Sequence, residues 1–269
     1  MRKLGAAVAL LILAAGAVYV IAPPYDSFTV SSRILREDRT ILEYLPAGYD
    51  TSSAAYPVLV LLDATPRRSV GGPSFYRNAE RVSALGSPVP AMIVLGVTNT
   101  HRTRDMIPAP DSLFPPAPGE AHKFLRFMTE ELLPVVEARY RTTGLRVLYG
   151  GSDAGLFALY ALTAAPDAFQ SVIASSPSLQ RSPGYMADAV MALFARRPRL
   201  ASAVFLVYGT NEGAAVSRGV PAFADLIRRY APHEFALGVS GIPGGGHVPT
   251  VGLEQGLQFV FGAARSEER

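Results

Sequence analysis

Mainly apolar runs of strand length and segments of helical periodicity alternate along most of the chain. Strands are predicted at 57–62, 91–97, 145–149, 170–174 and 203–208, and the run at 57–62 is apolar throughout, as in a strand buried on both faces. Segments that favour helix lie between them, at 75–85, 120–140, 156–162, 186–195 and 217–230. A last strand and a closing helix are predicted at 234–240 and 251–261. This alternation predicts an α/β fold, with a mostly parallel central sheet and helices on both faces.

Three segments depart from this alternation. Residues 28–32 and 40–45 are separated by a polar turn and are predicted to form a pair of opening strands. Residues 98–118 are rich in proline and are predicted to form a long loop. Pro134 interrupts the helix predicted at 120–140, so we expect that helix to kink or restart there.

The N-terminal segment, residues 1–24, has the pattern of a targeting sequence. Two basic residues precede an uncharged apolar run at 4–22. The run predicts either a signal peptide cleaved near 15–17 or a membrane anchor, because its length approaches the roughly 20 residues that span a bilayer. The basic pair predicts export, with the rest of the chain on the periplasmic or extracellular side and possible anchoring in the cytoplasmic membrane. Residues 25–269 are interpreted as one domain.

Composition narrows the possible chemistry. The 269 residues are 49% hydrophobic, which is enough for a large buried core. The chain has no cysteine, which excludes disulfides, thiol nucleophiles and thiolate metal ligands. The net charge is only +3 and the arginines are scattered, so nucleic-acid binding is not indicated.

A glycine-rich turn at 150–155, with the sequence Gly-Gly-Ser-Asp-Ala-Gly, joins a predicted strand to a predicted helix. Small neighbours allow the sharp, strained turn that exposes a serine side chain in a nucleophile elbow. The amide that follows Ser152 would then face a developing oxyanion at a helix N-terminus. Ala154 stands at the last glycine of the usual G-x-S-x-G pattern, and Gly155 follows it. The alternative interpretation is a structural turn in which Ser152 caps the helix.

A nucleophilic serine needs a general base, and the base needs an acid that orients it. His233 and His247 both follow Ser152, as the chain order of hydrolases requires, but only His247 follows the carboxyl end of a predicted strand. We therefore interpret His247 as the base. Glu212 occupies the equivalent place after the preceding strand and is interpreted as the acid, with Asp225 on the next helix as the alternative.

An oxyanion hole needs two backbone amide donors. Asp153 N–H is predicted to supply one of them. The other is expected from Thr65 or Ala64, in the loop that follows the strand at 57–62.

Several sequence blocks together carry a family resemblance. These blocks lie at 44–50 with 56–63, at 102–108, at 127–134 with 140–142, and at 169–178. Through them the chain resembles the putative-esterase family of α/β-hydrolases, which includes siderophore (enterobactin-type) esterases, S-formylglutathione hydrolases, feruloyl esterases and mycolyltransferases. The likeness runs from about residue 39 to 261 and is greatest to the siderophore-esterase branch. Gly151 stands where many members carry a histidine, and the chain has no tryptophan where siderophore esterases tend to carry a pair.

The resemblance implies an α/β-hydrolase fold and hydrolysis of a small-molecule ester without metal or cofactor. Ser152 matches the family nucleophile, His247 the base and Glu212 the acid. Thr65 matches the position whose amide helps to form the oxyanion hole, beside the amide of Asp153. The expected reaction passes through an acyl-enzyme intermediate.

Two further points stay open at the level of sequence. Arg102 and Arg104 could meet an anionic substrate, or they could form structural ion pairs, for example between Arg104 and Asp105. The same triad could also transfer an acyl group to an alcohol, and a membrane-tethered binding protein without catalytic activity is a third interpretation.

Overall fold

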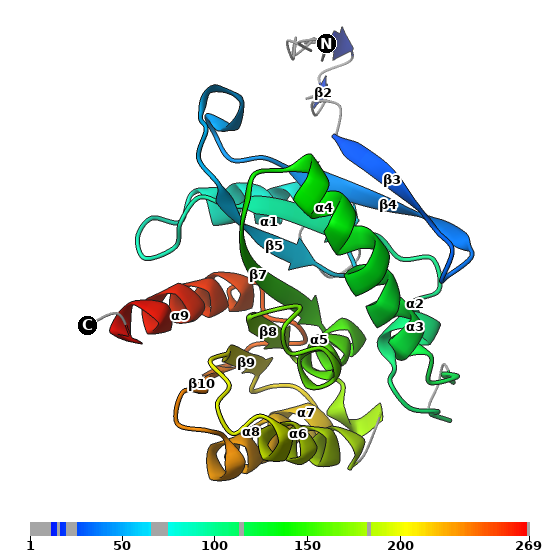
Figure 1. The fold of residues 1–269 in the computed structure, drawn as a ribbon, viewed down its shortest axis with the longest axis vertical. Helices are drawn as coiled ribbons and strands as arrows, with labels where there is room; N and C mark the ends of the chain where they lie inside the picture. The colour runs from blue at the N-terminus through cyan, green and yellow to red at the C-terminus, as the bar shows by residue number, and fades with distance from the viewer. Residues whose placement is uncertain are drawn as a thin grey trace.

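The computed structural model describes residues 12–14, 17–19, 26–65, 75–112, 116–181 and 184–267. Its main sheet has eight strands among these residues, in the order β10-β9-β8-β7-β5-β6-β4-β3 (Figure 1). They are β3 (Ser27–Ser32), β4 (Glu37–Tyr44), β5 (Tyr56–Leu61), β6 (Ile93–Val97), β7 (Thr142–Gly151), β8 (Ser171–Ser175), β9 (Ala203–Gly209) and β10 (Ala236–Ile242). The neighbours from β10 to β6 pair parallel, and β4 pairs antiparallel with both β6 and β3. The prediction of a mostly parallel sheet is confirmed.

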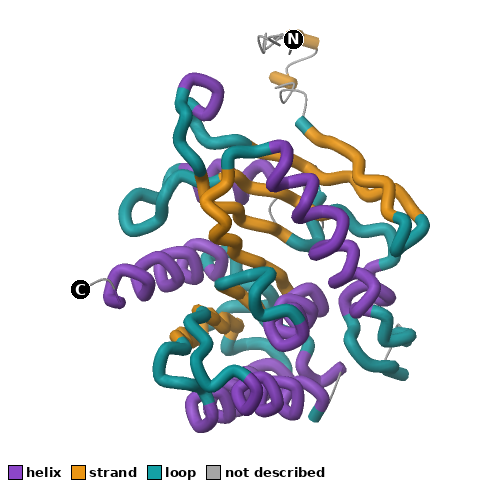
Figure 2. Tube along the Cα trace, viewed as in Figure 1, coloured by secondary structure: helices purple, strands orange, loops and turns teal. Residues whose placement is uncertain are grey.

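Helices cover both faces of this sheet (Figure 2), which is why a central strand such as β5 carries apolar side chains on both faces. In β5, Val58 and Val60 pack into one core cluster, whereas Leu59 and Leu61 pack into the other. The first cluster includes residues of α5, α6 and α8, and the second includes residues of α1 and α9. An uninterrupted apolar strand therefore supplies side chains to two cores in alternation.

The described helices are α1 (Phe75–Ser83), α2 (Arg102–Met106), α3 (Ala121–Arg126), α4 (Leu133–Arg139), α5 (Asp153–Ala164), α6 (Tyr185–Arg196), α7 (Ala214–Ser217), α8 (Gly219–Tyr230) and α9 (Gly252–Glu267). A π-helical segment, Phe127–Leu132, joins α3 to α4, and 3₁₀ turns lie at Tyr49–Thr51 and Leu179–Arg181.

Two helical regions refine the sequence prediction. The loop predicted at 98–118 contains the short helix α2. The helix predicted at 120–140 is interrupted as expected, because Pro134 stands at the start of α4 and a π-helical segment precedes it. Leu133 N–H donates to Met128 O, five residues back, so the helical turn before the proline contains one residue more than an α-helical turn.

Most of the predicted targeting segment lies outside the described residues. Within it the structure gives only β1 (Ile12–Ala14) and β2 (Ala17–Tyr19), two three-residue strands that pair antiparallel. Across the described ranges, no helix combines the length and the apolar character needed to cross a bilayer. The choice between a signal peptide and an anchor at residues 1–24 stays a prediction.

A cluster of charged side chains fastens α2 to the edge of the sheet. Arg39 of β4 is fully buried and forms ion pairs with Glu37 and Asp105. Arg104 binds the same two carboxylates, at 2.9 Å from Glu37 and 2.7 Å from Asp105. Two guanidinium groups therefore share two carboxylates, and the pairing keeps the buried charges compensated.

This cluster predicts a specific acid sensitivity. Burial raises the pKa of Glu37, but hydrogen bonds from Arg104 and Thr100 and the adjacent Arg39 outweigh it and lower the pKa from 4.5 to about 2. Because the folded pKa lies below the unfolded one, ionised Glu37 stabilises the fold above pH 4.5, and this contribution is lost as the pH falls towards 2. We expect Glu37→Gln to be less stable at pH 7 and to depend less steeply on pH across that window.

The measurement is the urea midpoint of unfolding between pH 7 and pH 2, with Glu234→Gln as control because Glu234 is exposed. Parallel curves for wild type and Glu37→Gln would contradict the prediction.

Candidate active site

Ser152 lies on a strained turn between β7 and α5. Its backbone has φ 60° and ψ −123°, a conformation that non-glycine residues rarely adopt. The turn is held by hydrogen bonds from Ser152 N to Ser175 O (2.8 Å) and from Ser178 N to Ser152 O (3.1 Å). Strain fixed in this way at a strand–helix turn is the geometry of a nucleophile elbow.

The backbone packing of Gly150 and Gly155 explains why this turn has glycine at positions 150 and 155 but accepts alanine at position 154. A Cβ on Gly150 would lie 2.1 Å from Ala154 O, and one on Gly155 would lie 3.1 Å from Gly150 O. Ala154 itself is fully buried, and its methyl group is accommodated in the core. The close approach therefore requires glycine at 150 and favours it at 155, while alanine is compatible with position 154.

His247 and Glu212 are brought together by the loops that follow β10 and β9. His247 Nδ1 lies 2.6 Å from Glu212 Oε2. The other carboxylate oxygen, Oε1, accepts hydrogen bonds from Gly209 N (2.7 Å) and Ser176 Oγ (2.6 Å). The Glu212 side chain is 5% exposed and that of His247 is 54% exposed, so a buried, fully engaged carboxylate orients an accessible imidazole. With its proton on Nδ1, the ring presents Nε2 as the basic atom.

The alternative acid is placed elsewhere. Asp225 lies on α8 and pairs with Arg228, one turn along the same helix, at 2.7 Å. The carboxylate that contacts His247 is that of Glu212.

Close backbone packing keeps the two loops side by side. A Cβ on Gly209 would lie 2.2 Å from Gly245 O, so only glycine allows this approach. Asn211 N donates to Gly245 O (3.1 Å) and Thr210 N donates to Ile242 O (3.0 Å). The glycine-rich sequence before His247 thus serves to fit its loop against the loop of Glu212.

The histidine loop also packs against the elbow. A Cβ on Gly151 would lie 2.8 Å from Val248 Cγ1, so Val248 occupies the space into which a side chain at 151 would project. Val248 has φ 53°, and its N–H donates to Ser176 Oγ (3.0 Å). The glycine at 151 and the valine at 248 are therefore complementary.

Ser176 and Ser178 complete this arrangement; the sequence predicted only that the segment starting near Ser178 lines the substrate pocket, and it indicated no role for Ser176. Ser178 Oγ lies 3.2 Å from Ser152 Oγ, within hydrogen-bond distance. Within the described part of the chain, no hydrogen bond joins Ser152 to His247. Such bonds often form only when substrate is bound. Ser176 links the carboxylate of Glu212 to the histidine loop.

The candidate oxyanion-hole residues lie at the ends of β5 and β7. Ala64 N–H donates to Val97 O (3.1 Å), so its amide is already engaged. Thr65 follows, and its carbonyl accepts a hydrogen bond from Phe75 N (2.9 Å). Asp153 N–H is the first amide of α5, where helix amides have no acceptor within the helix.

Both candidate substrate-binding arginines form ion pairs with carboxylates of the fold. Arg102 Nε lies 2.9 Å from Asp63 Oδ2, and Arg102 Nη1 lies 2.7 Å from Asp153 Oδ2. Arg104 pairs with Glu37 and Asp105, as described above. The structural pairing that the sequence left open is thus the arrangement that both side chains adopt.

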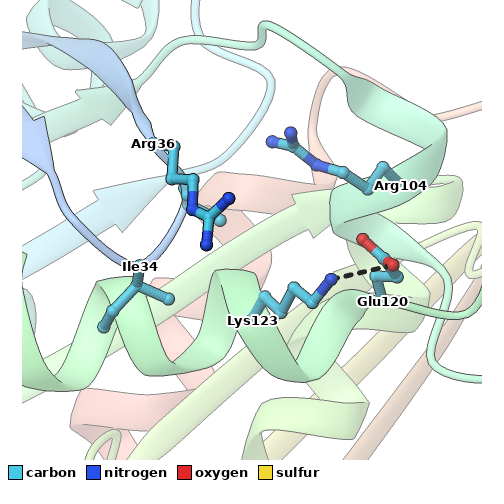
Figure 3. Close-up of a pocket in the computed structure, with 6 residues that line it drawn as sticks. Ile34, Arg36, Arg104, Glu120 and Lys123 are labelled. Atoms are coloured by element: carbon cyan, nitrogen blue, oxygen red, sulfur yellow. Dashed lines mark ion pairs between the residues drawn. The ribbon is translucent and has the colours of Figure 1, made fainter.

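Arg104 also lines a cavity of about 310 Å³ between the β3–β4 turn, α2 and α3 (Figure 3). Its other lining residues are Ile34, Leu35, Arg36, Glu120 and Lys123. Lys123 pairs with Glu120 at 2.8 Å. Carboxylates already compensate Arg104 and Lys123, so neither is an uncommitted ligand for an anion. Among the described residues, no group of three or more histidine, cysteine, aspartate or glutamate side chains is arranged to hold a metal ion.

The chain is similar to known proteins in sequence and in fold. Residues 32–244 match the family model described as "Putative esterase". The chain is 35% identical over 142 residues to the ferri-bacillibactin esterase BesA of Bacillus subtilis, covering 47% of this chain and 49% of BesA. It is 33% identical over 123 residues to the siderophore triacetylfusarinine C esterase of Aspergillus fumigatus, covering 45% and 40%. These alignments span about half the length of the curated relatives.

Among solved structures, the crystal structure of an IroE-like serine hydrolase from Shewanella oneidensis superposes with a TM-score of 0.78 and 28% sequence identity. The superposition covers 89% of this chain and 80% of that structure. Because the family model matches well over half of the residues, the chain belongs to the putative esterase family of α/β-hydrolases.

Proposed function

We propose that this protein is a serine hydrolase that cleaves carboxylic esters, with Ser152 as nucleophile, His247 as general base and Glu212 as the acid that orients His247. The observation that carries the proposal is the 2.6 Å contact between His247 Nδ1 and Glu212 Oε2, in a loop that packs against the strained serine turn. A serine, an accessible imidazole and a buried carboxylate at the carboxyl ends of neighbouring strands have the roles required for acyl transfer.

In the first half of the reaction, Ser152 Oγ attacks the ester carbonyl carbon while its proton passes to His247 Nε2. The resulting tetrahedral intermediate collapses with cleavage of the bond to the alcohol oxygen. His247 returns the proton to that oxygen, and the alcohol leaves. The acyl group remains bonded to Ser152 Oγ.

In the second half, water replaces the alcohol. His247 takes a proton from the water as its oxygen attacks the acyl carbon, and then gives the proton to Ser152 Oγ. The carboxylic acid leaves and the free serine is restored. Glu212 stays ionised throughout, because its role is to hold the imidazole and to stabilise the imidazolium that forms in each half.

The negative charge on the carbonyl oxygen is proposed to be held by the backbone amides of Asp153 and Thr65. The N-terminus of α5 favours this charge through the helix dipole. Donors fixed in advance stabilise the transition state more than the substrate, which is the basis of their catalytic effect.

The names of the relatives support hydrolysis over acyl transfer to an alcohol or a binding role without catalysis, because the two curated relatives described above are esterases. One is named as an esterase of ferri-bacillibactin and the other as an esterase of the siderophore triacetylfusarinine C, so we propose siderophore esters as the first natural substrates to test on this chain. No metal or cofactor takes part in the proposed steps.

The test follows release of p-nitrophenol from p-nitrophenyl acetate and butyrate by the full chain, with and without added glycerol. We expect enzyme-dependent release and free acid as the main product in both conditions. Glycerol ester as the main product would instead establish acyl transfer, and no release above the buffer rate would contradict the esterase proposal.

Ser176 provides a separate prediction about the orientation of the acid. Ser176→Ala removes one of the three hydrogen-bond donors to Glu212 and the acceptor of Val248 N–H. We expect kcat to fall on the order of tenfold with little change in KM, because hydrogen bonds to charged groups contribute about 1.5–3 kcal/mol and this one acts through the base. Steady-state kinetics on p-nitrophenyl acetate measure kcat and KM separately.

The control is Ser217→Ala, because the Ser217 hydroxyl donates to the carbonyl of Gly213, the N-cap residue of its own helix α7, and not to Glu212. A kcat for Ser176→Ala equal to that of Ser217→Ala would contradict the positioning role.

A further inference from the structure

Strand β10 is one edge of the main sheet, and among the described residues no strand pairs with its outer side (Figure 1). On its inner side it pairs in parallel with β9. Hydrogen bonds from Ala236 N to Ser202 O (2.9 Å) and from Thr210 N to Ile242 O (3.0 Å) mark the two ends of this pairing. Because the backbone groups of successive strand residues point to opposite sides, the even-numbered residues of β10 face β9 and the odd-numbered ones face outward.

The outward-facing residues of β10 are Leu237, Val239 and Gly241. Their backbone N–H and C=O groups make no hydrogen bond within the part of the chain that the structure describes. The side chains of Leu237 and Val239 pack against the core cluster that includes residues of α8, so the strand itself is held in place. A fixed row of unpaired donors and acceptors is a template for a further strand.

No charged side chain on this edge would repel such a strand. Residues 235–253 include no lysine, arginine, aspartate or glutamate, and no proline interrupts β10. Proteins commonly protect exposed edge strands with these residues. The opposite edge of the sheet does carry charges, because β3 lies between Asp26 and Arg33 and Asp38 of the neighbouring β4 is exposed. Strand β10 is therefore the unprotected edge.

The row of outward groups is symmetric about Val239, the middle residue of β10. An antiparallel second copy of β10 would place Val239 opposite its own counterpart and Leu237 opposite Gly241. Each facing pair would then exchange two N–H···O=C hydrogen bonds, as in an antiparallel ladder. A two-fold axis perpendicular to the sheet relates the two copies, so side chains near the axis meet identical side chains. The absence of charge on the strand favours this contact, because like charges would otherwise meet.

We propose that the protein forms a homodimer in which the β10 strands of two copies pair antiparallel and join the two sheets into one. The face covered by α8 in one copy continues into the same face of the other, so both core layers are preserved across the axis. The proposal does not depend on the proposed esterase function. It does affect the candidate site, because the loop that carries His247 directly follows β10 and is anchored by it.

Cysteine cross-linking tests the register of this pairing, because the chain has no cysteine of its own. In a dimer of Val239→Cys, the two facing Cα atoms would lie about 5.5 Å apart, a separation that a disulfide can span. We expect oxidation, or a short bis-maleimide, to link most of this variant into covalent dimers.

The control for the cross-link is Ser31→Cys, because Ser31 is exposed on the opposite edge strand β3. This variant is expected to stay mostly unlinked, although its thiol would be the more accessible of the two. Equal cross-linking of the two variants, or no cross-linking of Val239→Cys, would overturn the proposal.

A proline substitution tests whether the outward amides make the contact. Val239→Pro removes the N–H nearest the two-fold axis but no hydrogen bond to β9, because that N–H faces outward. We measure the mass of the full chain in mild detergent by size exclusion with light scattering, over a dilution series. We expect twice the mass of one chain for the wild type and the mass of one chain for Val239→Pro. Val239→Ala keeps the N–H and loses the same side chain, so it is expected to remain a dimer.

Two results would overturn the proposal. One is a wild type that stays monomeric over the whole dilution series. The other is a dimer that persists in Val239→Pro, which would assign the association to another segment, such as the apolar run at 4–22. If circular dichroism shows that Val239→Pro is unfolded, Leu237→Pro takes its place with Leu237→Ala as its control, because the Leu237 N–H also faces outward.

Discussion

Replacing Ser152 by alanine is expected to lower kcat for p-nitrophenyl acetate by about 10,000-fold or more, the scale found when a catalytic nucleophile is removed. The acyl-enzyme cannot form without Oγ, and the activity that remains comes from the oxyanion donors and substrate binding alone. The fold should persist, because alanine and serine have similar tolerance for the left-handed backbone at this position. Initial rates and thermal unfolding measure both effects.

Ser178→Ala is the matched comparison, because the two hydroxyls lie 3.2 Å apart in the same site. The Ser178 hydroxyl is a neighbour of the nucleophile, so its loss should cost only a few fold in kcat, as for a neutral hydrogen bond. The reverse pattern, in which Ser178→Ala is inactive and Ser152→Ala is active, would contradict the assignment of the nucleophile.

Replacing Glu212 by glutamine is expected to lower kcat by roughly 1,000- to 10,000-fold, as loss of the orienting carboxylate does in related triads. Glu212 Oε2 contacts His247 Nδ1, while Oε1 accepts from Gly209 N and Ser176 Oγ. A neutral amide stabilises the imidazolium less, and if its NH₂ group faces Nδ1 it favours the tautomer that carries the proton on Nε2, the atom that should act as base. Steady-state kinetics of the purified variant measure the loss.

Asp225→Asn tests the alternative acid under the same conditions. Asp225 pairs with Arg228 on the surface of α8, so its replacement should leave kcat within about twofold of wild type, as expected for an exposed ion pair. A large loss in Asp225→Asn, together with a small one in Glu212→Gln, would contradict the assignment of the acid.

Much of the fold was predictable because its strands are buried on both faces. Runs such as 57–62 and 203–208 are apolar at every position, and each supplies both cores of the sheet. Helix α2 was not predictable from periodicity, because it is a five-residue helix held by the pairing of Arg104 and Asp105 with residues of β4. Its stability comes from tertiary contacts, which a local pattern does not record.

The candidate site residues that could be predicted are those that directly follow the carboxyl end of a strand. His247 and Glu212 both follow the carboxyl ends of parallel strands, and such ends meet at one edge of the sheet. The role of Ser176 was not predictable, since its contacts with Glu212 and Val248 join residues 36 and 72 positions away. The contacts of Arg102 with Asp63 and Asp153 likewise join residues 39 and 51 positions away, which no local sequence pattern indicates.

The most direct test of a nucleophilic Ser152 is covalent labelling of the full chain with a fluorophosphonate, followed by intact-mass measurement and peptide mapping. The reagent forms a bond only with a serine that an adjacent base activates. We expect one adduct per chain, on the peptide that contains Ser152. We expect no adduct in Ser152→Ala, and much slower formation of the adduct in Glu212→Gln. An unlabelled wild type, or an adduct that persists in Ser152→Ala, would contradict a serine hydrolase built on Ser152, His247 and Glu212.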